Sequence, residues 1–122
     1  MYTRARGVYG KEIPEMREKD LEKILVREVK RLGGCAYKWV SPGNAGVPDR
    51  IIIFPNRAPI FAELKAEGGK PTQLQESQLK KLSELGQQVS VITGIHGLIL
   101  FFSDQGHQEI SYKLAKKYES EV

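Results

Sequence analysis

Apolar residues follow two different spacings along this chain, one typical of helices and one typical of strands. From residue 16 to residue 32 they recur every three or four positions, which predicts an amphipathic helix that ends at Gly33-Gly34. Further helices are expected over residues 72–85 and 110–121. Shorter runs of β-branched and aromatic residues predict strands over residues 36–40, 50–54, 59–65, 89–93 and 98–102.

This order of elements predicts a mixed β-sheet flanked by helices, which places the chain in the α/β class. The strands at residues 50–54 and 59–65 are separated by a short turn and are expected to form a hairpin. Residues 1–14 show no clear period and are expected to form a flexible basic arm. The arm is either a disordered terminus or a contact for nucleic acid or a partner. Residues 15–122 then form a single domain.

Composition narrows the classes of protein to which the chain can belong. Its 122 residues are 40% hydrophobic and 28% charged, which is typical of a globular domain. The net charge of +4 is compatible with a polyanionic partner. The single cysteine, Cys35, excludes an intrachain disulfide and a zinc site built on a CxxC pair. A membrane span of roughly 20 apolar residues and a signal peptide are both missing from the sequence, so a cytoplasmic location is expected.

The run at residues 59–65 carries a glutamate and a lysine two positions apart. Side chains alternate along a strand, so Glu63 and Lys65 share one face with Phe61. Burying both charges is costly unless they are paired with each other or bind a ligand. The alternative is an exposed ion pair on an edge strand, which contributes little to stability.

Asp49 opens the other strand of the expected hairpin, directly after Gly46-Val47-Pro48. In an antiparallel pair the start of one strand lies beside the end of the other, so Asp49 and Glu63 are expected to meet. Two neighbouring carboxylates repel each other unless a cation neutralises them. Oxygen ligands suit magnesium or manganese. The alternative for Asp49 is a cap on the turn.

The first predicted helix offers a third acid. Its apolar stripe is centred near Leu25 and Leu32, and Glu18 projects near the middle of that stripe. Glu18 is therefore expected to point toward the sheet, although a glutamate in a first helical turn is also favoured by the helix dipole. Glu22 lies toward the edge of the stripe and is the second choice.

Thr72 and Gln75 have the spacing of a capping box at the start of the second helix. Gln75 also shares helical spacing with Leu79 and Leu82, which turns it toward the sheet, where it could hold a water molecule or a phosphate oxygen. Both interpretations stay open. The residues expected to contact a nucleic acid are Lys38, Ser41, Asn44, Arg50 and Lys70.

Together these motifs resemble the VRR-NUC domains of the PD-(D/E)xK nuclease superfamily. The resemblance covers roughly residues 17–102 and rests on Glu18, Gly46-Val47-Pro48-Asp49, Glu63-Leu64-Lys65, Thr72-x-x-Gln75 and Leu85-Gly86. It implies a restriction-endonuclease-like core and a structure-selective endonuclease that depends on magnesium or manganese. Stand-alone domains of this size resemble those of phages and prophages. The minimal members of the family are associated with cutting four-way (Holliday) DNA junctions as homodimers.

The resemblance also assigns roles to the candidate residues. Asp49 and Glu63, with the Leu64 carbonyl, are expected to ligate the cation, and Glu18 to orient its water or a second ion. Lys65 is expected to position or deprotonate the nucleophile, and Gln75 to help hold it. The competing hypothesis is a module that binds DNA junctions or DNA ends without cutting them. Such a binder has no need for Asp49, Glu63 and Lys65 together.

Overall fold

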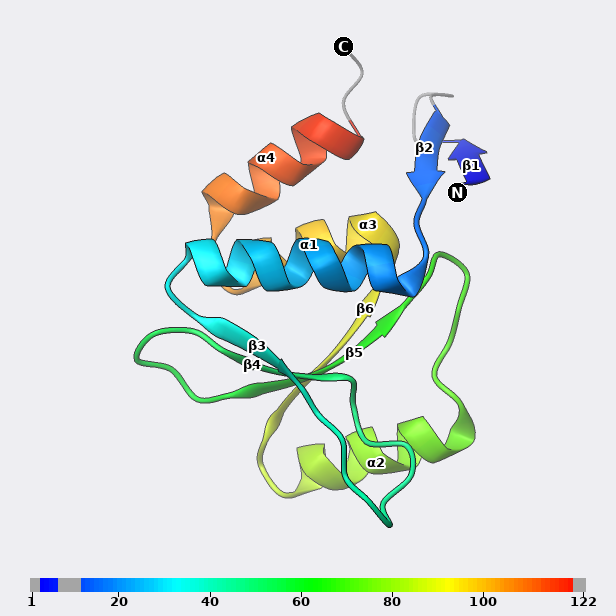
Figure 1. Ribbon diagram of the computed structural model, residues 1–122, viewed down its shortest axis with the longest axis vertical. Coiled ribbons are helices and arrows are strands. Elements are labelled where there is room, and N and C mark those ends of the chain that lie inside the picture. The colour runs from blue at the N-terminus through cyan, green and yellow to red at the C-terminus, as the bar shows by residue number, and fades with distance from the viewer. Residues whose placement is uncertain (1–2, 7–11, 120–122) are drawn as a thin grey trace.

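A four-stranded mixed sheet with helices on both faces organises the chain (Figure 1). A computed structural model describes residues 3–6 and 12–119. Its elements are β1 (Thr3–Arg6), β2 (Glu12–Glu15), α1 (Glu18–Arg31), β3 (Cys35–Lys38), β4 (Arg50–Ile53), β5 (Ile60–Lys65), α2 (Gln73–Glu84), β6 (Gln88–Thr93), α3 (Gly94–Asp104) and α4 (Gln108–Tyr118).

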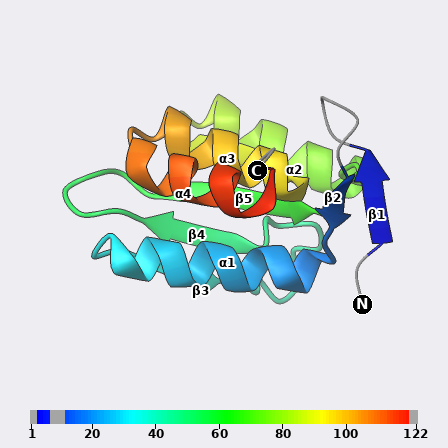
Figure 2. The same cartoon turned by 90° about the horizontal axis from the view of Figure 1, so that it is seen from above.

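The strands follow the order β3-β4-β5-β6 across the sheet. The β3–β4 and β4–β5 pairs are antiparallel, so the predicted hairpin is confirmed, and β5–β6 is parallel. Helices α1 and α3 lie on one face and α2 on the other, while α4 packs on the outside of α3 (Figures 1 and 2). The predicted mixed sheet with flanking helices is therefore confirmed.

The main hydrophobic core lies between the sheet and the α1–α3 layer. Strand β5 contributes alternate residues to it, Ile60, Ala62 and Leu64, each at most 2% exposed. This alternation turns Phe61, Glu63 and Lys65 to the opposite side of the strand. The alternation of side chains along β5 thus places three residues in the core and the candidate site residues on the opposite side of the strand.

The predicted strand at residues 98–102 is wrong, because these residues belong to α3. The helix begins at Gly94, whose φ of +65° lets the chain turn directly from β6 into a helix. Its buried residues Ile95, Leu98, Ile99 and Phe102 follow at helical spacing, while Leu100 on the other side of α3 is 48% exposed. In the sequence, however, every position from 98 to 102 is apolar. A short run that is apolar all round does not distinguish a buried helix from a buried strand.

The amino-terminal region also differs from the expectation of an arm without regular structure. Thr3–Arg6 pairs antiparallel with Glu12–Glu15, from Thr3 opposite Glu15 to Arg6 opposite Glu12. Residues 1–2 and 7–11 lie outside the described residues. The division into an arm at residues 1–14 and a domain at residues 15–122 stays a prediction. None of the helices in the described ranges is long and apolar enough to cross a membrane.

A fully buried glutamate ties α1 to α4. Glu28 is 0% exposed, and it accepts hydrogen bonds from Lys113 Nζ at 2.7 Å and Arg27 Nε at 3.2 Å. Burial by itself raises the pKa of Glu28, but these bonds outweigh burial and hold the pKa below its ordinary value. The buried charge is therefore stabilised by cations that reach it from the surface.

We predict that Lys113→Met lowers the free energy of unfolding by about 2 kcal/mol at pH 7, because it removes one partner of a buried charge. A lowered pKa stabilises the fold above the ordinary glutamate pKa, and this contribution disappears as the pH falls through the folded-state value. The difference from the parent should therefore shrink in acid. Urea unfolding across this pH range measures it, with Lys116→Met as control. Equal stability of parent and Lys113→Met at pH 7 would contradict the prediction.

Candidate active site

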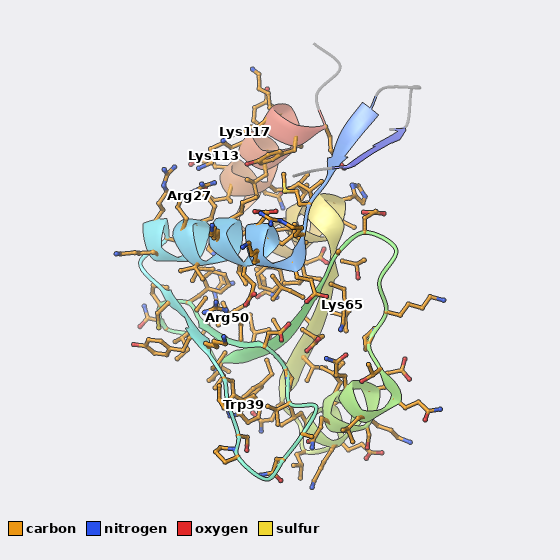
Figure 3. All side chains as sticks on the ribbon, turned by 45° about the vertical axis from the view of Figure 1, so that its right-hand side comes forward. Arg27, Trp39, Arg50, Lys65, Lys113 and Lys117 are labelled. Atoms are coloured by element: carbon orange, nitrogen blue, oxygen red, sulfur yellow. The ribbon has the colours of Figure 1, made fainter. Side chains whose placement is uncertain are left out.

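Glu63 and Lys65 form the centre of the candidate site, at the end of β5. Lys65 is labelled in Figure 3. Lys65 Nζ lies 3.2 Å from Glu63 Oε2, which confirms that the two side chains share one face. The Glu63 side chain is 1% exposed and that of Lys65 is 12% exposed. Glu63 is therefore buried and Lys65 is mostly covered, which excludes a solvated ion pair on a strand edge.

Asp49 joins this pair through the hairpin. The β4–β5 register places Arg50 opposite Ala62, so Asp49 stands beside the stretch that begins at Glu63. Its Oδ2 accepts a hydrogen bond from the Leu64 N–H at 2.9 Å, which fixes the carboxylate against β5. The expectation that Asp49 and Glu63 meet at this end of the hairpin agrees with the structure.

The charge on Glu63 is incompletely compensated. Burial raises its pKa most strongly, and the nearby Asp49 carboxylate adds to this, while the Lys65 ammonium opposes both. Glu63 Oε1 is buried and has no hydrogen-bond partner within the part of the chain that the structure describes. A buried oxygen without a partner is costly, and a cation is the ligand that removes this cost.

The residues present fit a divalent cation that is ligated by the protein on one side and by water or substrate on the other. Among residues 3–6 and 12–119 there is no cluster of three or more His, Cys, Asp or Glu side chains that would enclose a metal. Magnesium does not require one, because it keeps several waters and is commonly held by one or two carboxylates and substrate phosphates. Asp49 and Glu63 supply two such carboxylates.

The two helix acids occupy different positions. Glu18 is exposed in the first turn of α1, and its charge is the smallest of the influences that raise the Glu63 pKa, so it lies within electrostatic range of the pair. Glu22 pairs with Arg50 Nε at 3.0 Å. Arg50 also donates to the Ala36 carbonyl at 3.1 Å. Glu22, the second choice for the site acid, therefore has a structural partner.

Gln75 takes part in the capping box at the start of α2. Its Oε1 accepts from the Thr72 N–H at 2.9 Å, and Thr72 Oγ1 accepts from the Gln75 N–H at 3.2 Å. The capping interpretation is confirmed. Because the oxygen is engaged, the side-chain NH₂ is the group left to bind a water or phosphate.

The expected nucleic-acid contacts have varied surroundings. Lys38, Asn44 and Lys70 are exposed, and Asn44 Nδ2 donates to Ser41 Oγ at 3.0 Å. Arg50 has a side chain only 18% exposed and is bound to Glu22, so it is less available than the lysines. Whether any of these residues touches nucleic acid stays a prediction.

Sequence reasoning missed a contact that anchors the loop after Lys65. The carboxylate of Glu67 rests against Gly94 and occupies the space where a Cβ would stand. The first turn of α3 contains no acidic residue, and its N-cap, Thr93, makes no side-chain cap bond. Glu67 thus brings negative charge to the positive end of α3 from the loop. The only signal in the sequence was a glycine directly after a strand.

We predict that Glu63→Gln raises the free energy of unfolding at pH 7 in EDTA by on the order of 1 kcal/mol. A raised pKa favours the fold below the ordinary glutamate pKa, and this contribution is lost as the pH rises through the folded-state value. The advantage of Gln should therefore vanish in acid. Magnesium should stabilise the parent more than the variant. Thermal unfolding measures both effects, with the exposed Glu109→Gln as control. A variant less stable than the parent at pH 7 in EDTA would disprove this.

We predict that Gly94→Ala lowers the free energy of unfolding by about 2 kcal/mol, through strain at positive φ and a clash with Glu67. Adding Glu67→Ala should relieve the clash and recover part of the loss. Gly43→Ala is the matched control, since Gly43 has a φ of +81° and no neighbour within 4 Å of an added Cβ. A double-mutant cycle measures the coupling. If Glu67→Ala changed the stability of the Gly94→Ala protein no more favourably than that of the Gly43→Ala protein, the proposed contact would be refuted.

No family model matches the chain. A curated protein of Acyrthosiphon pisum secondary endosymbiont phage 1, named "Putative nuclease p44", is 52% identical over 77 residues, which are 63% of this chain and 83% of the relative. A solved structure titled "VRR_NUC domain" superposes with a TM-score of 0.59 at 28% identity, covering 63% of this chain and 83% of its own.

A second solved structure, titled "VRR_NUC domain protein", has a TM-score of 0.61 at 20% identity and covers 79% of this chain and 91% of its own. At that identity it supports the fold alone, which is the restriction-endonuclease-like fold of both structures. The phage relative covers enough of both sequences to establish kinship. The chain therefore belongs to the VRR-NUC nuclease family.

Proposed function

We propose that this nuclease is a structure-selective endonuclease that hydrolyses DNA phosphodiester bonds with magnesium or manganese. We further propose that it cuts four-way (Holliday) junctions as a homodimer. The observation that carries the chemistry is the buried Glu63 carboxylate, which has one oxygen paired with Lys65 and the other without a partner among residues 3–6 and 12–119. Asp49 beside it makes the arrangement a site for a cation.

In this proposal Asp49 and Glu63 hold the cation, with the Leu64 carbonyl as a further oxygen ligand. A bound divalent cation supplies Lewis-acid stabilisation and lowers the pKa of its water. Glu18, which is exposed and near enough to influence Glu63, is suited to orienting a water rather than to direct ligation. The Leu64 N–H keeps Asp49 in place throughout, because it is part of the strand.

Lys65 acts on the substrate side of this arrangement. Its Nζ donates to Glu63 Oε2 and still has donors for the attacking water or a phosphate oxygen. An ammonium so placed neutralises the negative charge that develops on the phosphoryl oxygens. The Gln75 NH₂ is the second candidate donor, because the capping box engages only its oxygen.

The junction preference and the homodimer rest on the family resemblance. Resolving a junction needs two symmetric cuts, and a twofold dimer supplies two equivalent sites. The phage relative makes the cytoplasm of a bacterial host the expected place of action.

We predict that the protein nicks a labelled four-way junction in pairs, with magnesium or manganese and not with EDTA. Glu63→Gln and Lys65→Ala should lower the cleavage rate by at least about a hundredfold while staying folded. Lys81→Ala, on the exposed side of α2, should cleave like the parent. Light scattering should give twice the chain mass of 13.7 kDa.

Each alternative has its own result. Cleavage of flaps or plain duplex in place of junctions would keep the chemistry and overturn the junction preference. A monomeric mass would overturn the dimer. Tight, salt-sensitive binding without cleavage would favour the binding module. Full activity in both site variants would remove the proposed mechanism.

A further inference from the structure

A basic groove is lined by residues of α1 and by Arg50 of β4. Figure 2 shows that α1 lies over β3, the edge strand of the sheet. The groove encloses about 590 Å³. The charged side chains that line it are Lys19, Glu22, Lys23, Arg27, Lys30 and Arg50. We refer to this feature as the α1 groove.

The α1 groove is rich in positive charge. It is lined by five cations and one carboxylate, and one of the cations, Arg27, is paired with the buried Glu28 at 3.2 Å. The single carboxylate, Glu22, is already bonded to Arg50. Within the described ranges, Lys19, Lys23 and Lys30 form no ion pair with an acid. The groove therefore presents cations that the fold itself leaves uncompensated.

The lysines of α4 contrast with those of the groove. Lys113 bonds to the buried Glu28, and Lys116 and Lys117 lie over the rings of Tyr112 and Tyr118 at 5.7 and 5.3 Å. Each of these three cations has a partner within the protein, which makes the α4 surface less available to an outside partner than the α1 groove.

The spacing of these cations suits a phosphate backbone. From Lys19 to Lys30 the helix advances by roughly 16 Å, at 1.5 Å per residue. A DNA strand places a phosphate about every 3.4 Å along the duplex axis, so the groove spans about five phosphates of one strand. An anionic membrane would require apolar side chains to insert, and Val26 is the one aliphatic residue lining the groove.

The α1 groove also begins beside the candidate active site. Lys19 directly follows Glu18 in the first turn of α1, and Arg50, the first residue of β4, directly follows Asp49. Two cations of the groove are thus adjacent in sequence to two acids of the candidate site. This proximity favours the substrate of the site over an unrelated ligand as the occupant of the groove.

We propose that the α1 groove binds the sugar-phosphate backbone of a DNA duplex arm that flanks the cleaved bond. The proposal rests on the proposed function for the identity of the substrate, and it adds Lys19, Lys23, Arg27 and Lys30 to the expected nucleic-acid contact Arg50. Contacts of this kind read backbone and not sequence, so they should add affinity without base preference.

The test compares two double variants of equal charge. Lys23→Gln/Lys30→Gln removes two exposed groove lysines, and Lys80→Gln/Lys81→Gln removes two exposed lysines from α2 on the other face of the sheet. Glutamine preserves helix propensity in both. Affinity for a labelled linear duplex and a labelled junction is measured in EDTA between about 50 and 200 mM salt.

We expect the groove variant to bind duplex roughly ten- to thirtyfold more weakly at about 0.15 M salt, with the slope of log K against log salt reduced by about 1.8. The α2 variant should keep the affinity and slope of the parent. Equal losses in both variants, or none in the groove variant, would overturn the proposal. So would binding of the parent to phosphatidylglycerol vesicles but not to duplex.

Binding in EDTA also separates this proposal from the proposed function. One outcome is that the parent shows no cleavage, while the groove variant still binds DNA more weakly and with a smaller salt dependence. In that case the nuclease assignment fails and the groove proposal stands. If the parent cleaves junctions and the groove variant binds and cleaves like it at subsaturating DNA, the groove fails and the nuclease assignment stands.

Discussion

The arrangement of the site depends on one carboxylate that the fold buries without fully compensating it. Glu63 sits on a central strand and is 1% exposed, so its charge must be met by its immediate neighbours. Lys65 meets one oxygen, and the hairpin brings a second acid, Asp49, close to it. The resulting excess of negative charge is unfavourable for the protein alone and favourable for cation binding. The position of Glu63 on β5 thus determines its burial, its proximity to Asp49 and its suitability for binding a cation.

A second buried glutamate shows that this imbalance is not a general property of the fold. Glu28 is at least as buried as Glu63, yet Lys113 and Arg27 bond to its oxygens and hold its pKa below the ordinary value. At Glu63 burial and Asp49 prevail, and the pKa is raised. The two glutamates are similarly buried, but their pKa values shift in opposite directions. This difference distinguishes Glu28, whose charge is structural, from Glu63, which is a candidate for ligand binding.

The parts of the site that follow from local periodicity could be predicted from the sequence. Alternation along a strand placed Glu63 and Lys65 on one face, and an antiparallel hairpin brought Asp49 to them. Contacts between distant segments could not be predicted this way, since no pattern in the sequence encodes them. The bonds of Arg50 to Glu22 and of Lys113 to Glu28 span 28 and 85 positions. The helix α3 was missed for a different reason, because residues 98–102 are apolar at every position, including the exposed Leu100, and this masks the helical spacing of the buried residues.

Helix α1 contributes to the core, to the candidate site and to the α1 groove with different parts of its surface. Its apolar side, with Leu21, Leu25 and Val29 each fully buried, fixes the helix on the sheet. Its first turn brings Glu18 within electrostatic range of Glu63. Its outer side carries the uncompensated lysines of the α1 groove. Because the helix is rigid, the packing of its apolar side on the sheet also fixes the positions of Glu18 and of the outer lysines. The orientation of the groove relative to the site therefore follows from core packing.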